Sequence, residues 1–252
     1  MIKRIPFCIY PLVTLTALSA TIDAHADFTE GSAALSSGNP HIPEPLLFDL
    51  VRPLGAKKGE LEINTLAQQN IHGGPMEWAP EIEYAIADGL AFELELPTEN
   101  SEITDYKVAM QGTFNNNFGN PNMIHGWQVI AKKNRETARY SSDVLYINGY
   151  RFLGQWSTLN MIGLRKPEFG KSSNAIGLIN NNLFYDFTPR YTFGLELNHE
   201  VNSKGQWRYS VTPQMHVDIN SNVTIQAGTG ISKLNLAKKS EKLFGLRMIY
   251  AF

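Results

Sequence analysis

The chain has 252 residues, with 22 Lys and Arg, 24 Asp and Glu, and a formal net charge of −2. This balance argues against a nucleic-acid-binding protein, which needs a basic surplus on one face. Charged residues make up 18% and hydrophobic residues 43%, which excludes an intrinsically disordered chain. A mean hydropathy of −0.22 argues against a helical membrane protein. These values are typical of strands that alternate apolar and polar residues, as in a membrane β-barrel.

The first 26 residues predict a secretory signal peptide. Lys3 and Arg4 form a charged start, residues 5–20 form an apolar stretch, and Ala24-His25-Ala26 has the small-x-small pattern of a cleavage site. The apolar stretch falls short of the roughly 20 residues that a membrane-spanning helix needs. We therefore expect export, with a mature chain that begins at Asp27.

Residues 27–58 form a separate N-terminal extension. They are rich in Ser, Gly and Pro and then carry an apolar stretch, residues 45–51. The extension is either a periplasmic tail or a plug inside a barrel. We favour partial occupation of the lumen, because Leu46, Leu47 and Phe48 need burial. The only cysteine, Cys8, lies in the predicted signal peptide, so the exported chain would have no disulfide.

Alternation with a period of two dominates residues 59–252, and it predicts strands with one apolar and one polar face. In residues 206–220, Trp207, Tyr209 and Val211 share one face, and Arg208 and Ser210 share the other. Turn signals divide the region into about twelve strands, in three of which (59–70, 142–153 and 174–187) a break in phase predicts a β-bulge. The predicted spans are 59–70, 77–87, 90–99, 106–115, 124–134, 142–153, 155–166, 174–187, 190–201, 206–220, 223–235 and 241–252.

The connections alternate in length, as those of outer-membrane barrels do. Tight turns at Asp88-Gly89, Thr188-Pro189 and Ser221-Asn222 alternate with longer loops, and residues 116–123 are an exception. Aromatic residues of the outward face gather at strand ends, which predicts two girdles at the membrane interfaces. A soluble β-sandwich would not need this sorting. We therefore predict an all-β fold: a transmembrane, antiparallel, up-and-down barrel over residues 59–252, in contact with the lipid of the bacterial outer membrane.

The last strand carries a specific pattern. Apolar and aromatic residues occupy every second position up to the final residue: Phe244, Leu246, Met248, Tyr250 and Phe252. This pattern resembles the C-terminal assembly signal of outer-membrane barrels. It implies that the barrel-assembly machinery is a partner of the chain.

The inward faces of the first strands carry an acidic wall, formed by Glu60, Glu62, Glu81, Glu83, Glu93 and Glu95. Later strands offer inward basic residues, which are Lys107, Lys132, Arg208 and Arg247. Two interpretations remain open. The charges could polarise an open channel, or they could pair into a network that braces or closes the lumen, because buried charges require partners. In both cases the lumen is polar.

No catalytic, cofactor or metal motif survives inspection. Gly170-Lys171-Ser172 lacks the earlier glycine of a phosphate-binding loop, because position 165 is Arg. His199 and Ser203 suggest a lipid-modifying barrel enzyme, but a spacing of four places them about 13 Å apart along a strand. We therefore predict no catalytic residue, no metal site and no cofactor, and keep an enzyme that uses His199 as an alternative.

Residues 80–97 carry a resemblance to a known family. The segment has a Tyr (Tyr84), a small-residue turn with Asp88, and then an alternating Glu/Leu strand that ends at Pro97. This hairpin resembles that of the outer-membrane proteins named for the meta-pathway of phenol degradation. The resemblance implies a transport-related barrel for small molecules, which could be aromatic or hydrophobic. The function expected is an outer-membrane channel; a lipid-modifying enzyme and a closed structural barrel are the alternatives.

Overall fold

The computed structural model describes residues 39–252, except 116–117, 171–173 and 234–239. The signal peptide predicted over residues 1–26 lies outside the described residues and stays a prediction. The strands are β1 (Leu61–Asn70), β2 (Met76–Ala87), β3 (Leu90–Glu95), β4 (Thr98–Glu99), β5 (Glu102–Ile103), β6 (Asp105–Thr113), β7 (Met123–Asn134), β8 (Tyr140–Phe152), β9 (Trp156–Lys166), β10 (Ile176–Thr188), β11 (Tyr191–Asn202), β12 (Trp207–Asp218), β13 (Val223–Ser232) and β14 (Glu241–Ala251).

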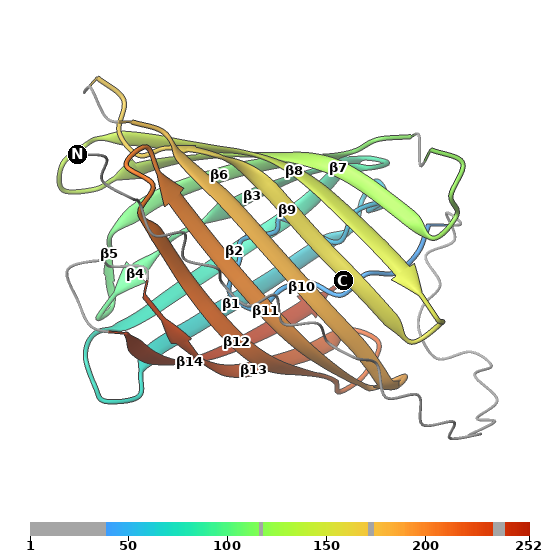
Figure 1. Cartoon of the computed structure of the whole chain (residues 1–252). Helices are drawn as coiled ribbons and strands as arrows, with labels where there is room; N and C mark the ends of the chain where they lie inside the picture. The colour runs from blue at the N-terminus through green and yellow to red at the C-terminus, as the bar shows by residue number, and fades with distance from the viewer. Residues whose placement is uncertain (1–38, 116–117, 171–173, 234–239) are drawn as a thin grey trace, which may run out of the picture. The chain divides into compact units, whose positions relative to one another are not determined.

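The strands close into an antiparallel barrel (Figure 1). Each long strand pairs with the next one in sequence, and β1 also pairs with β14. The wall therefore has twelve strands, since β4 and β5 are two-residue strands that extend the β2 edge beyond β3. The predicted all-β, up-and-down barrel is confirmed. The part of the chain that the structure describes contains no helix long and apolar enough to span a membrane.

One strand ends earlier than its sequence pattern predicts. The alternation predicts a strand over residues 90–99, but β3 stops at Glu95 and pairing resumes only in β4. Pro97 lies in the break, and it has no backbone N–H to donate to a neighbouring strand. The interruption is therefore local, and Leu96 still donates its N–H to Pro80 O at 3.0 Å.

Two of the three predicted β-bulges are wrong. The registers of β1 and β8 run without a shift on both sides, and that of β10 shifts only between Asp186 and Thr188. The breaks in phase arise because some inward positions are apolar. Leu145 and Ile147 of β8 and Leu178 and Phe184 of β10 all face inward and are buried. The inside of this barrel is therefore not uniformly polar.

The outer surface is apolar, as a lipid-facing wall requires. Leu195 and the other outward residues of β11 alternate with buried inward ones. Most of the aromatic residues predicted for the two girdles are exposed: Trp78, Tyr106, Trp207 and Phe244 near one end of the barrel, and Phe92, Phe114, Phe187, Tyr191, Phe193, Tyr250 and Phe252 near the other. Trp127 and Tyr185, also predicted for the second girdle, are only half-buried. We call the end with the tight turns, such as residues 88–89, the turn end, and the opposite end the loop end.

The five residues of the predicted assembly signal, which are Phe244, Leu246, Met248, Tyr250 and Phe252, lie on the outer face of β14 and its end and are all exposed. Phe252 also donates its N–H to Leu61 O at 3.0 Å, and its ring contacts Tyr250 edge-on, with ring centroids 4.6 Å apart. The terminal residue thus joins the two strands whose pairing closes the barrel.

Deleting Phe252 should lower the amount of folded barrel in the outer membrane, because it removes both the terminal aromatic and a bond across the β1–β14 seam. The measurement is the heat-modifiable band on a gel of outer-membrane fractions. Phe252→Tyr keeps the ring and the backbone bond and serves as the control. An unchanged band after the deletion would contradict the assigned role.

Candidate functional site

Residues 39–58 lie inside the barrel, and we call them the plug (blue in Figure 1). The plug starts at the turn end, where Arg151 Nε donates to His41 O at 2.9 Å. It returns to the same end, where the N–H of Gly89 donates to Ala56 O at 2.7 Å. Between these points the chain folds back inside the lumen. The domain boundary predicted at residue 58 precedes β1, which begins at Leu61.

Polar side chains of the wall hold the tip of the plug. Glu196 of β11 is fully buried and accepts the N–H of Leu47 at 3.0 Å and of Phe48 at 2.7 Å. Gln128 of β7 accepts the N–H of Val51 at 3.1 Å and donates to Asp49 O at 2.8 Å. The plug has no regular secondary structure, so these side chains supply partners that its buried backbone groups need.

The apolar side of the plug packs mainly against β7–β10, with β3 and β6 contributing one alanine each. Ile42, Leu50 and Leu54 form one cluster with Ile124, Ile147, Leu159, Met161 and Phe184 of the wall. Val51 forms a second with Ala91, Ala109, Ile130, Leu145 and Leu178. Inward glycines permit the close approach: a Cβ at Gly149 would lie 2.8 Å from Ile42 Cγ1, and one at Gly228 would lie 2.6 Å from Leu46 Cδ2. The wall is therefore shaped to fit the plug.

The acidic wall lies on the opposite side of the lumen, on and just before the first strands. Glu62, Glu81, Glu83, Glu93 and Glu95 are buried, and Glu60 is half-buried. Arg52 of the plug contacts two of them, with N···O distances of 3.3 Å to Glu60 and 3.7 Å to Glu62. Sequence patterns alone did not predict a role for Arg52. The available signal was a cation directly after the stretch of residues 45–51, whose apolar side chains need burial.

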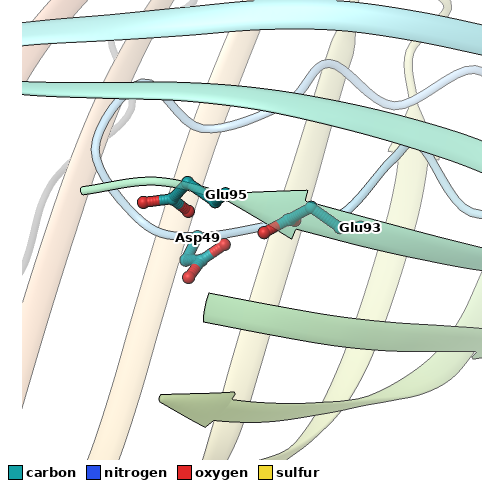
Figure 2. A group of neighbouring side chains, drawn as sticks. All are labelled: Asp49, Glu93 and Glu95. Carbon is teal, nitrogen blue, oxygen red and sulfur yellow. The ribbon is translucent and has the colours of Figure 1, made fainter. Parts of the chain in front are cut away.

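Lys107 of β6 connects the acidic wall to the plug. Its Nζ lies 2.5 Å from Asp49 Oδ2 and 2.8 Å from Glu93 Oε1, and it also contacts Glu95. Figure 2 shows these three carboxylates converging from the plug and from β3. The Lys107 side chain is only 1% exposed. Lys107 therefore provides a buried positive charge that three acidic groups share, one of which belongs to the plug.

Arg247 of β14 also reaches the plug. Its Nη1 donates to Pro45 O at 3.3 Å and lies 3.7 Å from Glu44 Oε2. Burial raises the pKa of Glu44 to about 8, and the neighbouring Glu62 carboxylate adds to this shift, while Arg247 and Arg52 oppose it. Glu44 is therefore mostly protonated at neutral pH. It adds no full negative charge to the interface between the plug and the wall.

Two of the predicted basic residues have other roles. Arg208 does not contact the acidic wall; its Nη1 lies 3.5 Å from Glu200 Oε2, its neighbour across the β11–β12 pair. Arg165, which the sequence analysis did not include, lies 2.6 Å from Glu200 and 2.8 Å from Asp143. Lys132 lines a cavity at the loop end. Strand register fixes two of these contacts, because Glu200 lies directly opposite Arg208 and Asp143 directly opposite Arg165.

A cavity of about 350 Å³ lies on the loop side of the plug. On the turn side, a space between the plug and the wall measures only about 10 Å³. The larger volume is that of a small-molecule site. It is lined by Leu47, Phe48 and Asp49 of the plug and by wall residues that include Leu66, Glu77, Glu81, Glu95, Ile130, Lys132, Asp143, Arg165, Glu200, Leu243 and Arg247.

His199 and Ser203 do not form a nucleophile pair. The His199 ring packs edge-on against Trp207, with centroids 6.0 Å apart, and Ser203 Oγ accepts a hydrogen bond from Asn174 at 2.7 Å. His199 lies in β11, whereas Ser203 follows the end of the strand. The structure therefore gives no support to an enzyme that uses His199.

A protein-family model described as HAEPLYID-like matches residues 40–159, just under half of the chain. Read as one-letter codes, the last six letters of that name agree at four positions with Glu44-Pro45-Leu46-Leu47-Phe48-Asp49, at the tip of the plug. No curated protein matches this sequence. The outer-membrane barrel implied by the hairpin of residues 80–97 agrees with the solved structures described next, but neither they nor the family model carry the name of the phenol family.

Several solved structures share the fold. The KdgM porin matches with a TM-score of 0.61 and 10% identity over 76% of this chain and 99% of its own. The NanC porin matches with a TM-score of 0.58 and 10% identity, over 75% of this chain and 98% of its own. An outer membrane channel from Pseudomonas putida F1 matches with a TM-score of 0.60 and 12% identity, over 79% of this chain and 97% of its own. At these identities the likeness establishes the architecture of outer-membrane channels and no more.

Proposed function

We propose that this protein is an outer-membrane channel for small molecules and that the plug controls its lumen. The barrel has the architecture of porins. One observation carries the proposal: a cavity of about 350 Å³ at the loop end stops at the plug. Side-chain contacts hold the plug in place rather than strand pairing, so it can move without opening the barrel wall.

The cavity favours small molecules that are neutral or cationic and partly apolar. Its lining carries six acidic residues (Asp49, Glu77, Glu81, Glu95, Asp143 and Glu200) and three basic ones (Lys132, Arg165 and Arg247). Acidic groups that line a pore select cations over anions. Leu47, Phe48 and Ile130 add apolar surface. We include aromatic and hydrophobic compounds in the proposed solute class, in agreement with the hairpin resemblance.

A reversible tether of the plug tests the proposal. A Cβ at Gly149 would lie 3.5 Å from Ile42 Cβ, within the roughly 3.5–4.5 Å that a disulfide spans. The double variant Ile42→Cys/Gly149→Cys should therefore conduct in planar bilayers when reduced and lose conductance when oxidised. The two single variants are the controls and should not respond to the redox state. Conductance of the reduced variant with a panel of solutes, which includes aromatic acids and aromatic amines, then shows whether the channel prefers cations or anions.

The closed structural barrel is the second candidate, because Leu46 and Val51 of the plug are fully buried. Glu196→Gln removes the charge that holds the tip of the plug and should increase conductance. If neither this variant nor the reduced tether variant conducts, the barrel is structural. Equal conductance of the oxidised and reduced tether variants would show that solutes pass without movement of the plug.

A further inference from the structure

Three buried carboxyl groups meet where the plug faces β2 and β3. Glu81, Glu83 and Glu93 each offer an oxygen, and these atoms lie within 4.8 Å of one another. Glu83 and Glu93 are directly opposite each other across the β2–β3 pair and are fully buried, and Glu81 is 8% exposed. Carboxylates at such distances repel strongly unless a cation or a proton lies among them.

The described basic residues do not balance this cluster. Besides Glu44, which is mostly protonated, seven carboxyl groups lie on the acidic wall and the plug: Asp49, Glu60, Glu62, Glu81, Glu83, Glu93 and Glu95. Four bases face them: Arg52, Lys107, Lys132 and Arg247. Arg52 is bound by Glu60 and Glu62, and Lys107 by Asp49, Glu93 and Glu95. Buried charge without a partner is strongly destabilising, so either protons or a further cation must balance the cluster.

Asn64 of β1 points to the nature of the balancing charge. It is 1% exposed, and its Nδ2 donates to Glu83 Oε1 at 2.8 Å. It also lies opposite Glu81 across the β1–β2 pair. Among the described residues, Asn64 Oδ1 and Glu83 Oε2 have no hydrogen-bond partner. A metal ion can bind amide and carboxylate oxygens together.

We propose that Glu81, Glu83 and Glu93, together with Asn64 Oδ1, bind a divalent cation, Ca²⁺. Ca²⁺ binds oxygens at about 2.3–2.6 Å, so two of its ligands lie at most about 5 Å apart. The limit of 4.8 Å for these carboxylates fits this geometry. The ion reaches the site from the loop-end cavity, which Glu81 lines. Asp49, Glu93 and Glu95 form a similar group, but Lys107 already occupies its centre.

This site goes beyond the proposed channel function, and it can be tested without any measurement of transport. Full-length barrel in detergent, stripped with EDTA, should bind one Ca²⁺ at pH 7 in equilibrium dialysis with radioactive calcium. Glu83→Gln should weaken binding by roughly tenfold or more, because Ca²⁺ affinity depends on the number of charged ligands. Heat-modifiable mobility on a gel shows whether each variant is folded. If Glu83→Gln does not fold, Glu81→Gln at the edge of the cavity takes its place.

Glu77→Gln is the matched control. Glu77 lies on β2 and lines the same cavity, but it is exposed and bonds to Gln68 instead. Its variant should bind Ca²⁺ like the unmodified barrel. No binding by the unmodified barrel would mean that protons balance the cluster and would overturn the proposal. An equal loss of affinity in Glu77→Gln and Glu83→Gln would also overturn it, because binding would then be a general effect of surface charge.

Discussion

Replacing Lys107 with Met should cost about 3–5 kcal/mol of folding free energy, because removing one partner of a buried ion pair leaves the others uncompensated. Here three carboxylates, those of Asp49, Glu93 and Glu95, would lose the same cation. Met keeps most of the length of the side chain, so the change in packing is small. The measurement is the urea midpoint of the barrel, followed by tryptophan fluorescence.

Lys132→Met is the matched control for this prediction. Lys132 lies opposite Lys107 across the β6–β7 pair and faces inward, but it lines the cavity and is only half-buried. Its replacement should cost less than about 1 kcal/mol, because the cavity leaves its charge in contact with water. Equal losses in the two variants would mean that Lys107 does not hold the plug to the acidic wall.

Leu195→Arg should destabilise the barrel by about 2–4 kcal/mol, because Leu195 faces outward near the middle of β11, where an arginine meets hydrocarbon. Inward parity alone predicts that the adjacent residue, Glu196, faces water and is a suitable control. The structure corrects this expectation, because Glu196 is fully buried and bonds to the plug.

A better control is Gln68→Arg, because Gln68 of β1 lines the acidic cavity at the loop end. Its replacement should change the urea midpoint little. If Gln68→Arg destabilises the barrel as much as Leu195→Arg does, the assignment of inner and outer faces is wrong.

The barrel was predictable because lipid and lumen impose a strict alternation on every strand. The alternation in β11 and β14, for example, matches the outward and inward faces closely. The same rule failed in β8 and β10, where Leu145 and Phe184 are apolar but face inward. Alternation with a period of two distinguishes the two faces of a strand only when one face contacts lipid and the other contacts water. In β8 and β10 the inward face contacts the apolar residues of the plug instead.

The candidate site was only partly predictable. Inward parity was enough to identify the acidic residues, because it depends on local spacing alone. The wall residues that bind the plug could not be predicted, because contacts such as that between Leu47 and Glu196 join positions 149 residues apart. Such contacts depend on how the chain folds back inside the closed barrel. Arg52 could have been identified as a cation in a buried segment, but its partners could not.

The interior of the barrel is apolar on one side and polar on the other, and an open channel would expose both sides. With the plug withdrawn, β8–β10 would present an apolar strip along the bore, formed by Ile147, Leu159, Met161 and Phe184. Gln214, Gln226 and Arg247 of β12–β14, beside the glutamates of β1–β3, would form a hydrated strip facing it. Water and inorganic ions would follow the hydrated strip and avoid the apolar strip. A flat amphiphilic molecule could place its polar face on the hydrated strip and its apolar face on the apolar strip. It would therefore fit the bore better than a fully solvated ion.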